Sequence, residues 1–203
     1  MPRDRRGLPR TDRTRSAPDQ DDPCHREPGR VLGPAVRYPR TVQVFLIRHA
    51  EAVPETLALS DPHRNLTANG RRQAVALGDR LRWHDCVPTH LWASPLVRTI
   101  QTAELVASGL HSELLVEAMP ALAPDGNPRD VVTALTALPA ASIVVVVGHE
   151  PGLSAVGALL VGQPEFASLA KAQAARIVDG TLRWRFAWDA DAPEIVTPSS
   201  PHR

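Results

Sequence analysis

The sequence predicts a three-layer α/β/α sandwich built around a mainly parallel sheet. Apolar runs of strand length alternate along the chain with longer segments whose apolar residues recur at helical spacing. The two most apolar runs, residues 41–47 and 142–147, are nearly continuous, as is typical of parallel strands buried on both faces. Apolar residues make up 43% of the 203-residue chain, which is enough for one buried core.

The elements of the first half follow from their apolar spacing and from the residues at their ends. The first strand leads into a loop rich in Pro and Asp. Thr67 is a suitable N-cap for a helix that continues to about Arg82. A second strand covers residues 89–93, and Pro95 suits the first turn of a helix that ends near Ser108.

The second half continues the alternation and ends in a hairpin. Asp179-Gly180 is a typical two-residue turn between two strands that alternate in polarity. The predicted elements are strands at 113–116, 142–147, 174–178 and 182–188 and helices at 128–138 and 152–161. Alternating strands and helices place helices on both faces of the sheet, which completes the three layers.

Residues 1–40 differ in composition from the rest of the chain. They contain 10 arginines, 7 prolines and 6 acidic residues, with apolar residues scattered without a period. Such a segment does not bury enough apolar surface to offset its ordering entropy, so we predict a disordered tail. The alternatives for this segment are a stretch that arises from an upstream start codon, a solvated leader, and an arm that binds a partner or nucleic acid. We divide the chain into this tail, a domain at 41–190 and a flexible C-terminal tail at 191–203.

The overall charge and hydropathy exclude several classes of protein. The net charge is +1, so the chain has no general attraction for nucleic acid or for membranes. The longest apolar run, five residues at 143–147, is far shorter than the roughly 18–20 residues that cross a bilayer. We therefore expect no nucleic-acid or membrane partner, and we expect a monomer.

The cysteines and neighbouring histidines do not predict a metal site. Cys24 lies in the tail and Cys86 follows a helix, so a structural disulfide is not expected and a reducing cytoplasm is the simpler location. His84, Asp85, Cys86 and His90 are metal-ligand types at close spacing, but no second cluster completes a tetrahedral set. We predict neither a metal ion nor another cofactor.

Polar residues follow the most buried strands at the point where each strand ends. Arg48-His49 follow the first strand, and Gly148-His149 follow the strand at 142–147. Ligands of open α/β sheets bind at the carboxyl ends of the strands, so these residues are the first candidates for a site. A third strand end leads into a helix that carries Arg98 in its first turn. The topology is expected to bring these groups together.

Two guanidinium groups and two imidazoles in one place suit a phosphoryl dianion. Arginine forks bind non-bridging oxygens in a bidentate manner, and the helices that begin after Ser94 and Gly148 would add backbone N–H donors. One imidazole can attack phosphorus while the other donates a hydrogen bond to oxygens that gain charge in the transition state. The residues therefore predict phosphoryl transfer.

These residues lie in four sequence stretches that occur in a fixed order. The stretches are LIRHAEA at 46–52, LTANGRRQA at 66–74, ASPLVRTIQTA at 93–103 and VGHEPGL at 147–153. From about residue 43 to residue 188 the chain resembles the histidine phosphatase superfamily, and within it the SixA-type phosphohistidine phosphatase branch. The resemblance implies a phosphoglycerate-mutase-like fold and a reaction that needs no metal. It also implies that His49 is the nucleophile, which forms a phosphohistidine intermediate, and that Arg48, Arg98 and His149 bind the phosphoryl group.

The proton donor is the main departure from the broader superfamily, whose members keep a carboxylic acid after a mid-chain strand. Glu117 is a candidate because it directly follows an apolar strand, and the alternative is a solvent-facing glutamate at a strand end. Glu51 and Asp125 are weaker candidates. Ala50 replaces a glycine of the broader superfamily, a small change that is familiar in the SixA-type branch.

The lack of a clearly placed acid bears on the substrate. An alkoxide is a poor leaving group that needs a positioned acid, whereas a protonated imidazole needs little help. The short loops around the site also favour an open pocket that admits a phosphohistidine carried by a protein. We expect an enzyme acting on such a phosphorylated protein, for example a phosphotransfer protein. The alternatives are a phosphomonoesterase acting on a small phosphate ester and a module that binds phosphorylated partners without turnover.

Two further residues are expected at the substrate. Arg64 precedes the second motif and resembles an arginine of the SixA-type branch that would extend the positive rim, the alternative being an exposed loop arginine. Ser94 is expected to contact the substrate at the start of its helix. Trp184 and Trp188 alternate with arginines on a hairpin strand, which favours packing in the core over stacking on nucleic acid.

Overall fold

The computed structural model describes residues 42–56 and 60–196. The predicted tail at 1–40 and the last residues, 197–203, lie outside the described part. The described residues form the elements of one sheet and its covering helices. In chain order these are β1 (Gln43–Arg48), η1 (Asp61–His63), α1 (Ala68–Arg82), β2 (His90–Ala93), α2 (Val97–Leu110), β3 (Glu117–Ala118), η2 (Pro120–Leu122), α3 (Pro128–Thr136), β4 (Ile143–Gly148), α4 (Gly152–Val161), β5 (Gln173–Val178), β6 (Thr181–Ala187) and β7 (Glu194–Ile195).

The sheet confirms the predicted fold class. Its strand order is β3-β2-β4-β1-β5-β6-β7. β3, β2, β4 and β1 pair in parallel, whereas β5, β6 and β7 are added through antiparallel pairings. Five of the seven strands in the described part of the chain therefore run in the same direction, and the sheet is mixed at one side.

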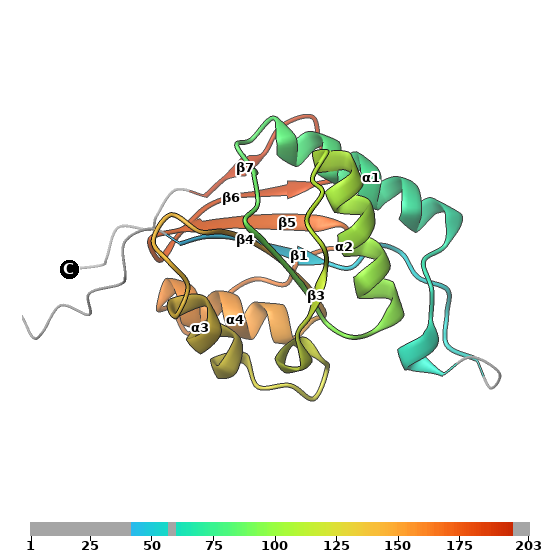
Figure 1. The fold of residues 1–203 in the computed structure, drawn as a ribbon, viewed down its shortest axis with the longest axis horizontal. Coiled ribbons are helices and arrows are strands. Elements are labelled where there is room, and N and C mark those ends of the chain that lie inside the picture. Colours follow the sequence, from blue (N-terminus) through green and yellow to red (C-terminus); the bar gives the residue numbers. More distant parts are fainter. Residues whose placement is uncertain (1–41, 57–59, 197–203) are drawn as a thin grey trace, which may run out of the picture. The chain divides into compact units, whose positions relative to one another are not determined.

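Helices cover both faces of the sheet, as the sequence predicts (Figure 1). α1 and α2 pack together over one face, where Phe45 and Ile47 meet the buried Leu77 of α1. α3 and α4 cover the other face, where Leu46 packs in a second cluster with Leu153 of α4. The alternation of β1 side chains between the two clusters explains why its sequence is continuously apolar. Within the described ranges, no helix has the length and apolar character needed to cross a bilayer.

The first helix begins where its cap predicts. Thr67 adopts an extended conformation and its hydroxyl accepts a hydrogen bond from the Gly70 N–H at 2.9 Å. Gly70 is required for a second reason, because a Cβ at this position would collide with the backbone carbonyl of Glu51. The start of α1 is therefore pressed directly against the segment that follows β1.

Two boundaries differ from the prediction. α2 begins at Val97, with Leu96 as its extended N-cap, so Pro95 lies before the helix and not in its first turn. The strand predicted at 113–116 is wrong, because the residues that pair with β2 are Glu117–Ala118. The apolar character of that run misled the prediction, since Leu115 is 86% exposed.

The C-terminal part of the sheet extends the predicted hairpin. β5 and β6 are joined by Asp179-Gly180, whose φ angles of 51° and 69° match the type I′ turn expected for this pair. β7 (Glu194–Ile195) then pairs with β6. The sheet therefore continues beyond residue 190, where the sequence placed the end of the domain.

The central pairing of the sheet positions the site. β1 and β4 are adjacent and parallel, in a register that places Arg48 opposite Gly148. The residues that follow them, His49 and His149, therefore leave the same edge of the sheet. The His49 N–H continues the ladder by donating to the Gly148 carbonyl at 3.1 Å.

Candidate active site

Two histidines face each other at the carboxyl edge of the sheet. The ring centroids of His49 and His149 are 5.3 Å apart, with an angle of 58° between the ring planes. Both side chains are buried, and so is Arg98, which is only 5% exposed. The structure thus brings together two groups that follow β1 and β4 and one from α2, separated by up to 100 positions in the sequence, from His49 to His149.

The His49 ring is oriented by its own backbone. Its Nδ1 lies 2.8 Å from the Ala50 carbonyl oxygen, which only accepts hydrogen bonds, so Nδ1 carries the proton. Nε2 is then left with a free lone pair. Burial, together with the positive charges of Arg98 and Arg48, lowers the pKa of His49 to about 4 against the opposing effect of that hydrogen bond. The ring is therefore neutral and nucleophilic at physiological pH.

His149 is held between a hydroxyl and a guanidinium. Its Nε2 lies 2.9 Å from the Ser94 hydroxyl, and its Nδ1 lies 3.4 Å from an Arg98 amino group. Arginine only donates, so Nδ1 accepts and Nε2 carries the proton in the neutral ring. Burial and the nearby charges of Arg98 and His49 lower the pKa of His149 to about 3. Ser94, predicted to contact substrate, is fully buried and in this structure contacts His149.

The two arginines have buried Nε atoms without a partner in the described part of the chain. Arg48 donates through one terminal nitrogen to the Leu169 carbonyl at 2.8 Å. Arg98 directs both terminal nitrogens at Asp61, with distances of 2.8 Å to its carbonyl oxygen and 3.0 Å to its carboxylate. A buried guanidinium N–H without an acceptor is costly, so an anion that supplies one stabilises the site.

The first motif is tied to α2 through Thr102. The Thr102 hydroxyl accepts a hydrogen bond from the Ala50 N–H at 3.1 Å and donates to the Arg98 carbonyl at 2.6 Å. Because the Ala50 carbonyl orients His49, this link couples the position of the imidazole to the helix that carries Arg98. Thr102 is fully buried, so the link is shielded from water.

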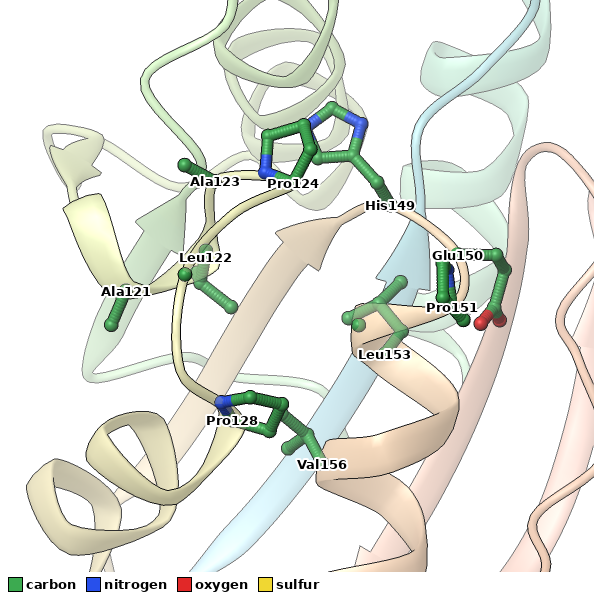
Figure 2. A pocket seen from close by; sticks show the side chains of 12 residues that line it. Ala121, Leu122, Ala123, Pro124, Pro128, His149, Glu150, Pro151, Leu153 and Val156 are labelled. Atoms are coloured by element: carbon green, nitrogen blue, oxygen red, sulfur yellow. The ribbon is translucent and has the colours of Figure 1, made fainter.

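The orientation of Arg48 depends on the segment between α4 and β5. The Leu169 carbonyl accepts from Arg48, and the Leu169 N–H donates to the Glu150 carboxylate at 2.7 Å. The second carboxylate oxygen of Glu150 accepts from the backbone N–H and the hydroxyl of Ser154. Both carboxylate oxygens of Glu150 are therefore engaged, and Figure 2 shows the carboxylate turned away from the neighbouring pocket.

That pocket lies beside His149 and has mostly apolar walls (Figure 2). It is bounded by the turn around η2, which includes Leu122 and Pro124, and by Leu153 at the start of α4. Apart from His149 and Glu150, the residues that line it carry no ionisable side chain. A part of a substrate that lies here would be in contact with an apolar surface.

The three candidate acids are not placed as proton donors. Glu117 is exposed on β3, and Asp125 is exposed in the loop that follows η2. The Glu51 carboxylate accepts hydrogen bonds from the Thr67 hydroxyl at 2.7 Å and the Asn69 amide at 3.1 Å, and these lower its pKa. Glu51 is thus an anion that holds the start of α1.

Arg64 contacts Asp61, as Arg98 does, and it is bound to protein groups. It donates to the Val53 carbonyl and to the Asp61 carboxylate, both at 2.7 Å. Its side chain is 20% exposed, so it is neither a free loop residue nor fully buried. Arg64 and Arg98 hold the Asp61 carboxylate between them.

Two charged residues of the site were missed by the sequence reasoning. Asp61 lies in a loop without periodicity, and its importance depends on contact with Arg98, 37 positions away. Lys171, the sole lysine of the chain, is exposed next to Ala172, whose N–H bonds to the Arg48 and His49 carbonyls. The scarcity of lysine was a signal that could have drawn attention to it.

A metal centre is not evident among the described residues. In the two described ranges, no group of three or more His, Cys, Asp or Glu side chains is arranged to hold a metal ion. The imidazole and guanidinium groups of the site suit an anion.

Comparison with known proteins defines the class to which this fold and site belong. The family model of the histidine phosphatase superfamily (branch 1) matches residues 44–123. Phosphohistidine phosphatase SixA of Escherichia coli (strain K12) is 32% identical over 112 residues, which cover 54% of this chain and 68% of that protein. The chain therefore belongs to the histidine phosphatase superfamily.

Further relatives place the chain in the SixA-type branch. A phosphohistidine phosphatase SixA homolog of Haemophilus influenzae is 29% identical over 164 residues, covering 76% of this chain and 93% of that protein. A solved structure of the protein histidine phosphatase SixA complexed with tungstate superimposes with a TM-score of 0.67 at 27% identity, covering 72% of this chain and 97% of the other. Both the superfamily and the branch suggested by the four motifs are thereby confirmed.

Proposed function

We propose that this protein is a phosphatase that acts through a phosphohistidine intermediate on His49, with a phosphohistidine in another protein as its substrate. The observation that carries this proposal is the neutral His49 ring, whose Nε2 is left free by the hydrogen bond from Nδ1 to the Ala50 carbonyl. A free imidazole lone pair beside two buried guanidinium groups is what attack on a phosphoryl group requires. The SixA-type relatives support the choice of substrate.

The proposed reaction has two displacements. His49 Nε2 attacks phosphorus, the bond from phosphorus to the leaving group breaks, and its electron pair stays on the leaving group. Water then attacks the phosphorylated His49, which releases orthophosphate and restores the neutral ring. Arg48 and Arg98 hold the equatorial oxygens in both steps. Burial and the charges of Arg98 and His49 lower the pKa of His149, and a bound dianion offsets those charges and favours the protonated ring. Once protonated, Nδ1 no longer accepts from Arg98 and can donate to a phosphoryl oxygen.

The state of the carboxylates supports cleavage of a P–N bond over a P–O bond. Glu51 and Asp61 both have lowered pKa values, Glu51 through hydrogen bonds from Thr67 and Asn69, so they are ionised at neutral pH. An ionised carboxylate does not donate a proton to a departing alkoxide. An imidazole leaves from phosphorus with its own second proton in place and needs no such donor.

A substrate panel tests the proposal. Wild-type protein in the presence of EDTA is expected to hydrolyse a phosphohistidine-bearing protein faster than sugar phosphates, and to be labelled by a 32P-phosphoramidate. His49→Ala should abolish labelling and reduce turnover on the order of 10³-fold or more. His90→Ala, which removes an imidazole at the start of β2, is the matched control and should retain activity. No labelling of the wild type, or dependence on added metal, would contradict the mechanism. Faster turnover of sugar phosphates would favour the phosphomonoesterase alternative.

A further inference from the structure

Asp61 is the acidic residue in contact with the arginines of the site. Among the described residues, it is the only acidic side chain that hydrogen-bonds to Arg48 or Arg98. One carboxylate oxygen accepts from Arg64 at 2.7 Å and the other from Arg98 at 3.0 Å. Its backbone carbonyl also accepts from Arg98 at 2.8 Å, so three hydrogen bonds hold Asp61 in place.

The carboxylate of Asp61 is held as an anion. Partial burial alone would raise the pKa of Asp61, but hydrogen bonds from Arg98 and Arg64 and the charges of both arginines outweigh burial and lower the pKa. The groups that face it are Arg64 from its own segment, Arg98 from α2 and His149 from the end of β4, and its charge acts on the His149 ring. Asp61 is therefore a fixed negative charge at neutral pH, suited to accept hydrogen bonds and not to donate a proton.

The same carboxylate has unused acceptor capacity. Two carboxylate oxygens offer about four lone-pair positions, of which the two arginines use two. The Asp61 side chain is 35% exposed, so a bound substrate can reach it. Arg98 contacts both the Asp61 carboxylate and the His149 ring, so Asp61 lies beside the groups expected to bind the phosphoryl group.

Resting on the phosphatase function proposed above, we propose that Asp61 is a specificity-determining residue that accepts a hydrogen bond from the protonated ring of the phosphohistidine leaving group. The apolar pocket beside His149 offers a surface for the carbon edge of such a ring (Figure 2), and Asp61 supplies an acceptor for its N–H. A phosphate ester has no equivalent donor on its leaving oxygen. Asp61 thereby favours a phosphoryl group on a protonated nitrogen over one on oxygen.

The step balances without an added acid. The substrate ring carries phosphorus on one nitrogen and a proton on the other, so it is cationic. His49 attacks phosphorus, the P–N bond breaks, and the electron pair returns to the ring, which departs as neutral imidazole. Imidazole rings titrate near neutral pH, at about 6.5 when unperturbed, so an anion that favours the protonated ring increases the reactive fraction of substrate. This benefit grows as the pH rises.

The substitution Asp61→Asn tests the inference by comparing two substrates. It should lower kcat/KM for a phosphohistidine-bearing protein on the order of 10-fold more than kcat/KM for p-nitrophenyl phosphate, since a charge-assisted hydrogen bond is lost. The gap between the two substrates should widen from pH 6 to pH 8. Asp61→Glu should retain most of the preference. Asp79→Asn is the control: it removes a partly exposed carboxylate of α1 that pairs with Arg82, and it should leave both kcat/KM values unchanged.

The alternative role for Asp61 gives a different result. If Asp61 only orients Arg98, Asp61→Asn lowers kcat/KM for both substrates by the same factor at every pH, and the inference is overturned. The temperature of unfolding with and without orthophosphate shows whether the variant is folded and still binds the anion. A wild-type protein that cleaves p-nitrophenyl phosphate but not phosphohistidine would overturn the proposed function itself, which is a distinguishable outcome.

Discussion

Replacing Thr102 by Val is expected to weaken both the fold and the active site. The change preserves the shape of the side chain but removes the hydroxyl that accepts from the Ala50 N–H and donates to the Arg98 carbonyl. The Arg98 carbonyl lies within α2, so the helix itself still supplies a donor to it. The Ala50 N–H, by contrast, would be left buried without an acceptor. Such a group costs about 1–3 kcal/mol. For a domain of this size, a loss of about 2 kcal/mol lowers Tm by roughly 4–8 °C.

The same substitution should reduce catalysis through the adjoining peptide. The Ala50 carbonyl accepts from His49 Nδ1, so a displaced Ala50 loosens the orientation of the nucleophile. We expect kcat to fall on the order of 10-fold, as small misplacements of reacting groups are costly. Thermal unfolding followed by circular dichroism and turnover of a phosphohistidine substrate measure the two effects.

A matched control isolates the contribution of Ala50. Thr133 on α3 also donates its hydroxyl to the carbonyl four residues earlier, at 2.9 Å, but it is exposed and accepts no hydrogen bond from another segment. Thr133→Val therefore removes only the bond within the helix and should leave Tm nearly unchanged. Equal Tm values and equal kcat values for the two variants would refute the reasoning.

Three other perturbations address the charges and the close contacts of the site. Burial lowers the pKa values of His49 and His149 to about 4 and about 3, so kcat/KM, corrected for substrate ionisation, should hold as pH falls through 6.5 and be lost only near pH 4. Since the two rings bind protons more readily in the unfolded chain, the free energy of unfolding should also decrease from pH 6.5 toward 4. A loss of activity centred at pH 6.5 would contradict the lowered pKa values on which both expectations depend. Gly70→Ala should destabilise the fold by about 1–3 kcal/mol in denaturant unfolding, whereas Gly152→Ala, which meets no atom within 4 Å, should not show this collision cost. Arg98→Lys keeps the charge but loses the fork, so orthophosphate binding measured by calorimetry should weaken about 10-fold, and unchanged binding would show that geometry is unimportant.

The parts of the fold that the sequence predicted well have local signals. α1 and α4 and the hairpin turn at Asp179-Gly180 agree with the predictions because a cap, an apolar period or a turn pair marks each of them. The strand at 113–116 was wrong because strand pairing depends on a neighbour. β2 ends at Ala93, and its last residues align with Glu117–Ala118 and not with the more apolar residues before them.

The candidate site shows the same division. Arg48, His49 and His149 were predicted from their places at strand ends, and the structure brings them together with Arg98, while their catalytic roles stay predictions. Asp61 could not be predicted in this way. Its role depends on side chains from another element and on partial burial, neither of which leaves a pattern in the sequence around it.

The peptide of Leu169 gives core packing a direct influence on catalysis. Its side chain is 1% exposed within the cluster beneath α4, while its N–H and carbonyl join Glu150 to Arg48. The contacts to Arg48 and Glu150 are made by main-chain atoms of Leu169, so they require no particular side chain that a sequence motif could match. A conservative change in the hydrophobic interior at position 169 can therefore behave as an active-site mutation, with its effect transmitted to the phosphoryl group through a single arginine.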